Sequence, residues 1–152
     1  MSKVCIALDY SPSATQVAEI GFAHAHMLNA EITLIHVVAD AGNYQMGYSS
    51  IMGFEGYTLD TNLEVMKALR QNSEEYLKKA VDHLGDQNIK TQVLTGDTAE
   101  ALLDFAGDWG ADLIVLGTHS HSALENFFMG NTAASVVKHT KIPLLVIPVK
   151  DE

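Results

Sequence analysis

The sequence predicts an α/β fold in which a five-stranded, doubly wound parallel sheet carries helices on both faces. Strand-like and helix-like segments alternate along the 152 residues, and most of the strand segments are near-continuous apolar runs. Such runs are typical of parallel strands that are covered on both sides. Right-handed crossovers then produce the doubly wound arrangement. One domain is expected over residues 1–152, because this length suits a single core.

The first strand and helix have clear sequence signals. A strand is expected over residues 3–9, and either Ser11 or Ser13 can cap the helix that follows. This helix is expected to reach about Leu28. Its apolar face has helical spacing and small side chains, so it can lie close to a sheet: Ala14, Val17, Ala18, Gly21, Ala25 and Leu28.

The second strand is expected over residues 31–38, and the segment after it, residues 39–60, shows no clean periodicity. Glycines and aromatic residues dominate that segment. An irregular loop of this length is uncommon in a compact domain and is often functional. Two interpretations remain open: a lid over a ligand, or a surface excursion whose aromatic side chains pack on the body or on a partner subunit.

The second half of the sequence continues the alternation. A long helix is expected over residues 61–84, ending at Gly85, and a strand over residues 90–94. Asp97 and Glu100 form a capping-box pattern for a helix through Trp109. Strands are expected over residues 111–116 and 144–149, with a helix over residues 133–139 between them. The long helix carries an apolar stripe: Leu63, Met66, Leu69, Leu77, Ala80, Val81 and Leu84.

Composition limits the possible partners and compartments. The formal charge of −10 repels nucleic acids and anionic membranes, so neither is an expected partner. No apolar run approaches 18 residues, so no membrane span is expected. The single cysteine, Cys5, is expected in the core and suits a reducing compartment. The sequence start lacks the pattern of a signal peptide, so a cytoplasmic protein is expected.

The stretch from Gly117 to Thr132 carries most of the functional information. Gly117 opens a loop after an apolar strand, hydroxyl residues fill the first half of the loop, and Gly130 closes it at a helix start. Free backbone N–H groups and a helix N-terminus together make a site for an anion. A site for phosphate is therefore expected here, and two turn glycines with no ligand are the alternative.

These residues resemble the nucleotide-binding branch of the universal stress protein family, and the resemblance covers essentially the whole chain. That branch carries the pattern Gly-x2-Gly-x9-Gly-Ser/Thr after its fourth strand. Gly117 and Ser120 occupy the first two glycine positions, nine residues follow, and Gly130, Asn131 and Thr132 close the pattern. Outside the loop, the resemblance includes Asp9 after strand one, His36-Val37 at the end of strand two, and the closing segment 142–148.

The resemblance implies a strand order of 3-2-1-4-5, an ATP-type ligand (ATP, ADP or AMP, with Mg²⁺) between strands one and four, and a homodimer. Asp9 would accept hydrogen bonds from ribose hydroxyls or from the adenine amine, and Val37 would offer its backbone to adenine. The implied nucleotide-binding residues are Ala7, Asp9, Ser11, Val37, Gly117, Thr118, His119, Ser120, His121, Ser122, Gly130, Asn131 and Thr132.

Two residues depart from the family pattern. Ser120 stands at the second glycine position and adds a Cβ where phosphates approach. Asn131 stands where serine or threonine is usual and keeps a polar group at a helix start. Both departures point to weaker ATP binding than the full pattern would give.

Three functions therefore remain open: a nucleotide-binding regulatory module, a slow ATP hydrolase, and a dimeric scaffold without nucleotide. The first is favoured, and no catalytic residue is assigned. Phosphoryl transfer normally needs a cationic clamp, and no lysine or arginine lies between Lys90 and Lys138. His119 and His121 alternate in the loop, but two histidines fall short of a zinc site, so the metal ligands remain unknown. The dimer is expected to use the strand at residues 144–149, because an apolar sheet edge needs cover.

Overall fold

The computed structural model describes residues 1–38, 55–118 and 130–149, and for residues 55–62 it describes the backbone alone. Five parallel strands form one sheet in the order β3-β2-β1-β4-β5, which confirms the order expected from the resemblance. The strands are β1 (Lys3–Ala7), β2 (Glu31–Val38), β3 (Lys90–Thr95), β4 (Leu113–Gly117) and β5 (Leu144–Ile147).

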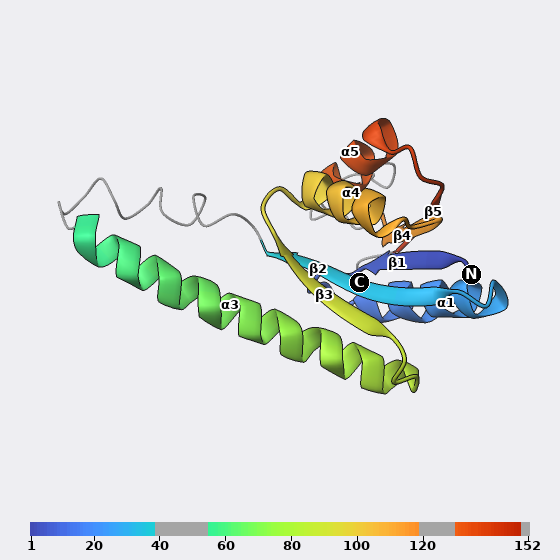
Figure 1. Cartoon of the computed structure of the whole chain (residues 1–152), viewed down its shortest axis with the longest axis horizontal. Coiled ribbons are helices and arrows are strands. Elements are labelled where there is room, and N and C mark those ends of the chain that lie inside the picture. Colours follow the sequence, from blue (N-terminus) through green and yellow to red (C-terminus); the bar gives the residue numbers. More distant parts are fainter. Residues whose placement is uncertain (39–54, 119–129, 150–152) are drawn as a thin grey trace.

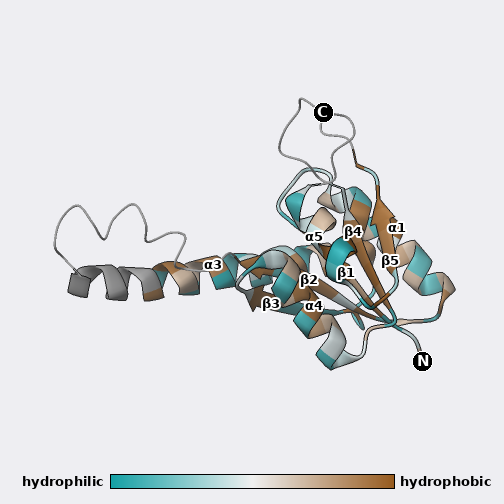
Figure 2. Ribbon diagram, turned by 90° about the horizontal axis from the view of Figure 1, so that it is seen from above, coloured by the Kyte–Doolittle hydropathy of each residue, from teal (hydrophilic) through white to brown (hydrophobic). Residues whose placement is uncertain are grey.

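Helices cover both faces of the sheet, as the sequence predicts (Figure 1). Helices α1 (Ala14–Met27) and α3 (Glu55–Leu84) lie on one face, and α4 (Thr98–Trp109) and α5 (Asn131–His139) lie on the other. The apolar strands lie in the middle of these layers (Figure 2). Val4 and Ile6 of β1 enter the core under α1 and α3, whereas Cys5 enters the core under α4 and α5.

The small-sided face of α1 lies close to the sheet, as predicted, and Gly21 makes this approach possible. A Cβ at Gly21 would lie 3.0 Å from Val115 Cγ1 and 3.1 Å from Ile6 Cδ1. One residue assigned to this face, Leu28, is 52% exposed, so that assignment is wrong. The helix ends at Met27, and Leu28 belongs to the turn that connects α1 to β2.

The long helix α3 begins earlier than the sequence predicts. It starts at Glu55, so residues 55–60 are helical rather than part of an irregular loop, and residues 39–54 lie outside the described residues. Gly56 made this stretch resemble a loop, but a glycine in a helix costs only about 1 kcal/mol relative to alanine. Leu63, assigned to the apolar stripe, is 62% exposed because α3 extends past the sheet it covers (Figure 1).

Helix α4 shows how the local sequence determines where a helix begins and ends. Asp97 is the N-cap residue of α4, and its side chain accepts a hydrogen bond from the Glu100 backbone N–H at 3.0 Å. Gly110 ends the helix with φ 81°, a left-handed conformation that favours glycine. Within the part of the chain that the structure describes, no helix combines the length and apolar character needed to cross a membrane.

The buried thiol of Cys5 predicts a loss of stability at alkaline pH. Burial raises the pKa of this thiol from 9.0 to about 12. The unfolded chain therefore loses its thiol proton first, and stability that is present below pH 9 is lost as pH rises towards 12. The expected loss is up to about 1.4 kcal/mol per pH unit. Urea unfolding of the wild type and of Cys5→Ala at several pH values tests this. If the free energy of unfolding fell equally with pH in both proteins between pH 9 and 10, the prediction would be contradicted.

Candidate functional site

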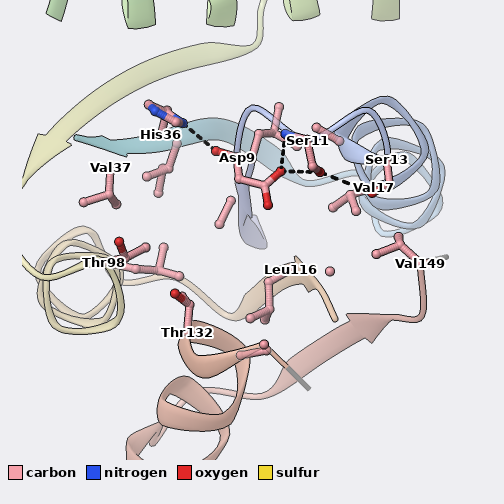
Figure 3. A pocket seen from close by; sticks show the side chains of 18 of the residues that line it. Asp9, Ser11, Ser13, Val17, His36, Val37, Thr98, Leu116, Thr132 and Val149 are labelled. Carbon is pink, nitrogen blue, oxygen red and sulfur yellow. Dashed lines mark hydrogen bonds between the residues drawn. The ribbon is translucent and has the colours of Figure 1, made fainter. Parts of the chain in front are cut away.

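A cavity of about 570 Å³ opens at the carboxyl ends of β1, β2 and β4, where the strand order reverses (Figure 3). Open α/β sheets bind their ligands at this point. The volume falls in the range of small-molecule sites. The lining residues come from the carboxyl-terminal parts of β1, β2 and β4, from the first halves of α1, α4 and α5, and from the segments next to them: Ala7, Leu8, Asp9, Ser11, Ser13, Ala14, Val17, Ile35, His36, Val37, Thr98, Leu102, Leu116, Gly117, Gly130, Asn131, Thr132, Ala133 and Val149.

The polar side of the cavity is built on Asp9. Its Oδ1 accepts hydrogen bonds from the Ser11 backbone N–H at 2.9 Å and from the Ser11 hydroxyl at 2.6 Å. The Ser11 and Ser13 hydroxyl oxygens lie 3.2 Å apart. Among the described residues, Asp9 Oδ2 has no hydrogen-bond donor, and Figure 3 shows the carboxylate directed into the cavity. This oxygen can therefore accept a hydrogen bond from a ligand hydroxyl or amine.

The first turns of α1 and α5 reach the cavity without a side-chain cap. Ser13 is the N-cap residue of α1 and Gly130 that of α5, and neither helix has a capping hydrogen bond from that position. The predicted capping of α1 by Ser11 or Ser13 is therefore wrong, because the Ser11 hydroxyl binds Asp9 instead. Asn131 is the first residue of α5 rather than its cap. Uncapped N–H groups at a helix start favour an anion.

Gly117, another lining residue, packs closely against two valine side chains. A Cβ at Gly117 would lie 2.8 Å from Val17 Cγ2 and 3.6 Å from Val149 Cγ2. Gly117 has no positive φ, so the position needs glycine for space rather than for backbone freedom. The absence of a side chain here allows the end of β4 to pack closely against Val17 of α1.

Most of the described candidates from the sequence line this one cavity: Ala7, Asp9, Ser11, Val37, Gly117, Gly130, Asn131 and Thr132. Thr118 is not among the lining residues. Its hydroxyl accepts a hydrogen bond from Val149 N–H at 3.1 Å, and its carbonyl accepts one from Gly130 N–H at 3.4 Å. Thr118 thus holds two lining residues in place. His119, Ser120, His121 and Ser122 lie outside the described residues.

Sequence reasoning missed the contribution of α4. Thr98 and Leu102 line the cavity, and the Thr98 and Thr132 side chains lie across it from Asp9 (Figure 3). Thr98 follows the carboxyl end of β3 and the cap at Asp97, so the rule that ligands bind at carboxyl strand ends could have found it. His36 and Val149 were also missed as lining residues, although His36 lies in a segment that carries the family resemblance and Val149 directly follows one.

The described lining of the cavity carries no positively charged lysine or arginine side chain. Asp9 is the acidic residue in this described lining. The described residues also contain no group of three or more His, Cys, Asp or Glu side chains that could hold a metal ion. An anion here would therefore depend on backbone dipoles or on a cation that arrives with it.

Comparison with known proteins agrees with this geometry. The model of the universal stress protein family matches residues 1–148. The chain belongs to the universal stress protein family. Universal stress protein MJ0531 of Methanocaldococcus jannaschii is 28% identical over 148 residues, which cover 95% of this chain and 81% of that protein.

Solved structures of other family members share the fold. The structure of MJ0577, from the same organism, has a TM-score of 0.76 at 21% identity and covers 100% of this chain and 99% of that one. A universal stress protein in complex with cAMP has a TM-score of 0.61 at 18% identity, and the match covers 96% of this chain and 95% of that one. The universal stress protein from Archaeoglobus fulgidus in complex with dAMP has a TM-score of 0.59 at 17% identity, and the match covers 99% of this chain and 98% of that one.

Proposed function

We propose that the cavity binds an adenine nucleotide and that the protein acts as a nucleotide-binding regulatory module in the stress response. The observation that carries the proposal is the convergence of the Asp9 carboxylate and the uncapped start of α5 on one cavity at the strand-order reversal. Family members in complex with cAMP and dAMP support an adenine nucleotide as the ligand class. The single cysteine suits a reducing compartment, so we propose the cytoplasm as the site of action.

The two ends of a nucleotide suit the two ends of the proposed site. Asp9 Oδ2 suits ribose hydroxyls or the adenine amine, because a carboxylate only accepts hydrogen bonds. Val37, half-buried at the end of β2, offers an apolar side chain and backbone groups to the base. Phosphates suit Gly117 and the first turn of α5, because N–H groups and the positive end of the helix dipole favour anions. Loop residues 119–122 would complete the phosphate site.

A magnesium ion fits this proposal. The protein carries a formal charge of −10, and the described lining offers no lysine or arginine to neutralise a triphosphate. Magnesium is commonly held by one or two carboxylates together with phosphate oxygens. The side chains with oxygen atoms in the described lining are Asp9, Ser11, Ser13, Thr98, Asn131 and Thr132. The ion would neutralise phosphate charge, and we propose binding rather than rapid hydrolysis, because the described lining lacks a cationic clamp.

Mass spectrometry of small molecules released from the purified protein is the first test, with ATP, ADP or AMP as the expected result. Calorimetric titration with AMP and with ATP, each with and without Mg²⁺, should then show binding, with the larger magnesium dependence for ATP. Asp9→Ala should weaken both by at least tenfold, about 1.4 kcal/mol. Asp108→Ala, an exposed acid on α4 outside the cavity, is the matched control. A wild type that binds none of these nucleotides would leave the ligand-free scaffold as the function.

We also propose a symmetric dimer through β5, an edge strand whose residues Leu144, Leu145 and Val146 are half-buried. The carbonyls of Pro143 and Ile147 accept hydrogen bonds from the β4 side, so the alternate residue Val146 directs its N–H outwards. Val146→Pro should therefore abolish pairing of this edge while leaving the sheet folded, since proline is tolerated on edges. Sedimentation at micromolar concentration should show a dimeric wild type and a monomeric variant, and a monomeric wild type would contradict the proposal.

A further inference from the structure

Three consecutive residues after β1 are held by groups from outside their own loop. The Leu8 carbonyl lies 2.7 Å from His36 Nδ1 on β2, and a carbonyl only accepts, so Nδ1 carries the hydrogen. The Asp9 carbonyl accepts a hydrogen bond from the Tyr76 hydroxyl of α3. Tyr10, next in the chain, lies 2.7 Å from the buried Ser73 hydroxyl of α3. We call the four residues Tyr10, His36, Ser73 and Tyr76 the Asp9 clamp.

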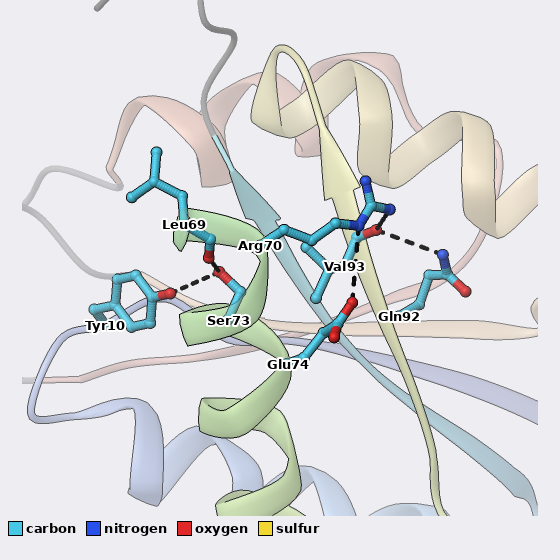
Figure 4. Close-up of polar contacts among 7 residues, drawn as sticks. All are labelled: Tyr10, Leu69, Arg70, Ser73, Glu74, Gln92 and Val93. Carbon is cyan, nitrogen blue, oxygen red and sulfur yellow. Dashed lines mark hydrogen bonds and ion pairs between the residues drawn. The ribbon is translucent and has the colours of Figure 1, made fainter. Parts of the chain in front are cut away.

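The hydrogen bonds in the clamp have a defined direction. The Ser73 hydroxyl donates its one hydrogen to the Leu69 carbonyl at 2.9 Å (Figure 4). The Tyr10 hydroxyl must therefore donate to Ser73 Oγ. Burial first, and then the charge of Asp9, raise the pKa of Tyr76 to about 12. Tyr76 thus stays protonated at neutral pH and remains a donor to the Asp9 carbonyl.

Packing of the aromatic rings reinforces these hydrogen bonds. The ring centroids of Tyr10 and His36 lie 4.2 Å apart, and those of Tyr10 and Tyr76 lie 4.8 Å apart with an edge-on orientation. The same stretch of α3 is anchored to the sheet, because Arg70 donates to the Val93 carbonyl of β3 at 3.3 Å (Figure 4). The clamp therefore connects the loop that carries Asp9 to a helix docked on the sheet.

We propose that Tyr76 and Ser73 are positioning residues that hold the Asp9 carboxylate in its nucleotide-accepting orientation and so couple occupancy of the cavity to the docking of α3. This inference rests on the proposed nucleotide binding. Tyr76 holds the backbone of Asp9 on one side, while the carboxylate is directed into the cavity on the other. Coupling between two sites is reciprocal, so a ligand that binds Asp9 stabilises the clamp and the α3 segment that forms it.

The first test needs no ligand and compares Tyr76→Phe, which removes only the hydroxyl, with His83→Ala. His83 makes a separate polar contact of α3, at 2.8 Å to Glu19 of α1, and it does not line the cavity. Amide hydrogen exchange over residues 9–13 should become faster in Tyr76→Phe and should stay unchanged in His83→Ala. Unchanged exchange in Tyr76→Phe, or equal acceleration in both variants, would overturn the clamp.

The second test measures AMP binding by calorimetry. Tyr76→Phe should lower the affinity about three- to tenfold, the equivalent of one hydrogen bond, and His83→Ala should leave it unchanged. In an Asp9→Ala background, Tyr76→Phe should have no further effect, because Tyr76 acts through Asp9. Additive effects would overturn the positioning role. A wild type that bound no nucleotide would instead overturn the proposed function, and the ligand-free exchange test would still decide the clamp.

Amide exchange in α3 tests the coupling between occupancy of the cavity and the docking of this helix. AMP should slow amide exchange in the α3 segment from Leu69 to Leu77 of the wild type, and this protection should be lost in Tyr76→Phe at saturating AMP. His83→Ala should retain the protection. Equal protection of this segment in the wild type and in Tyr76→Phe would show that occupancy does not act through the clamp.

Discussion

Gly117→Ala is expected to lower the free energy of unfolding by about 1–3 kcal/mol and to impair nucleotide binding. The added Cβ would lie 2.8 Å from Cγ2 of Val17, a distance that forces a shift. Val17 is a buried residue of α1 with a short branched side chain, so it has little freedom to move away. The shift would be transmitted to α1 and to the cavity that both residues line. Urea unfolding measures the stability, and calorimetry with AMP measures the binding.

Two further variants make this prediction specific. Gly107→Ala in α4 adds the same methyl group where no atom lies within 4 Å, so it should stabilise the protein by about 0.5–1 kcal/mol. In a Val17→Ala background, Gly117→Ala should cost close to nothing, because the clashing methyl group is gone. The same cost in both backgrounds would contradict the steric explanation.

The local sequence was sufficient to predict those helices and strands whose bounds depend only on residues close by in the chain. The strand expected over residues 31–38 is β2 with the same bounds, because a run rich in Ile and Val favours a buried parallel strand. The cap at Asp97 and the stop at Gly110 were also predicted, since both depend on local hydrogen bonds and backbone angles. The strand order came from the family resemblance, because no local pattern records which strands are neighbours.

The site could be predicted in part for a geometric reason. Carboxyl ends of parallel strands meet at one edge of the sheet, so Asp9, Val37 and Gly117 were expected to lie near one another, and they line one cavity. The clamp behind Asp9 could not be predicted. Tyr76 lies 67 residues from Asp9, and the side chain of a tyrosine in an amphipathic helix gives no indication of a distant carbonyl partner.

The wrong assignments also have identifiable physical causes. Leu63 and Leu28 fit a helical period, but periodicity shows which side chains share a face, not whether a sheet lies beneath them. Leu63 lies in the first part of α3, which projects beyond the sheet, and Leu28 lies just after the end of α1. The predicted serine caps of α1 failed because the Asp9 carboxylate accepts the Ser11 hydroxyl, a contact that competes with capping.

Gly130→Val is expected to weaken nucleotide binding by at least tenfold, about 1.4 kcal/mol, while leaving the sheet folded. Gly130 lines the cavity at the start of α5, where phosphate oxygens would approach the backbone N–H groups. Its φ of −56° and ψ of 157° suit any L-residue, so a side chain at this position brings no backbone strain. The effect should therefore come from the volume of the valine side chain alone. Calorimetry with Mg-ATP and urea unfolding measure the two quantities.

Ala134→Val is the matched control, because Ala134 is an exposed residue of the same helix that does not line the cavity. It should lower stability slightly through helix propensity and leave the affinity for Mg-ATP unchanged. Gly130→Ser tests the role of the free N–H groups separately from side-chain volume. A serine hydroxyl at the N-cap position can accept hydrogen bonds from the N–H groups of α5. That variant should raise stability while lowering affinity, since the capped N–H groups are no longer free for phosphate. Equal affinities in the wild type, Gly130→Val and Gly130→Ser would exclude the start of α5 from the phosphate site.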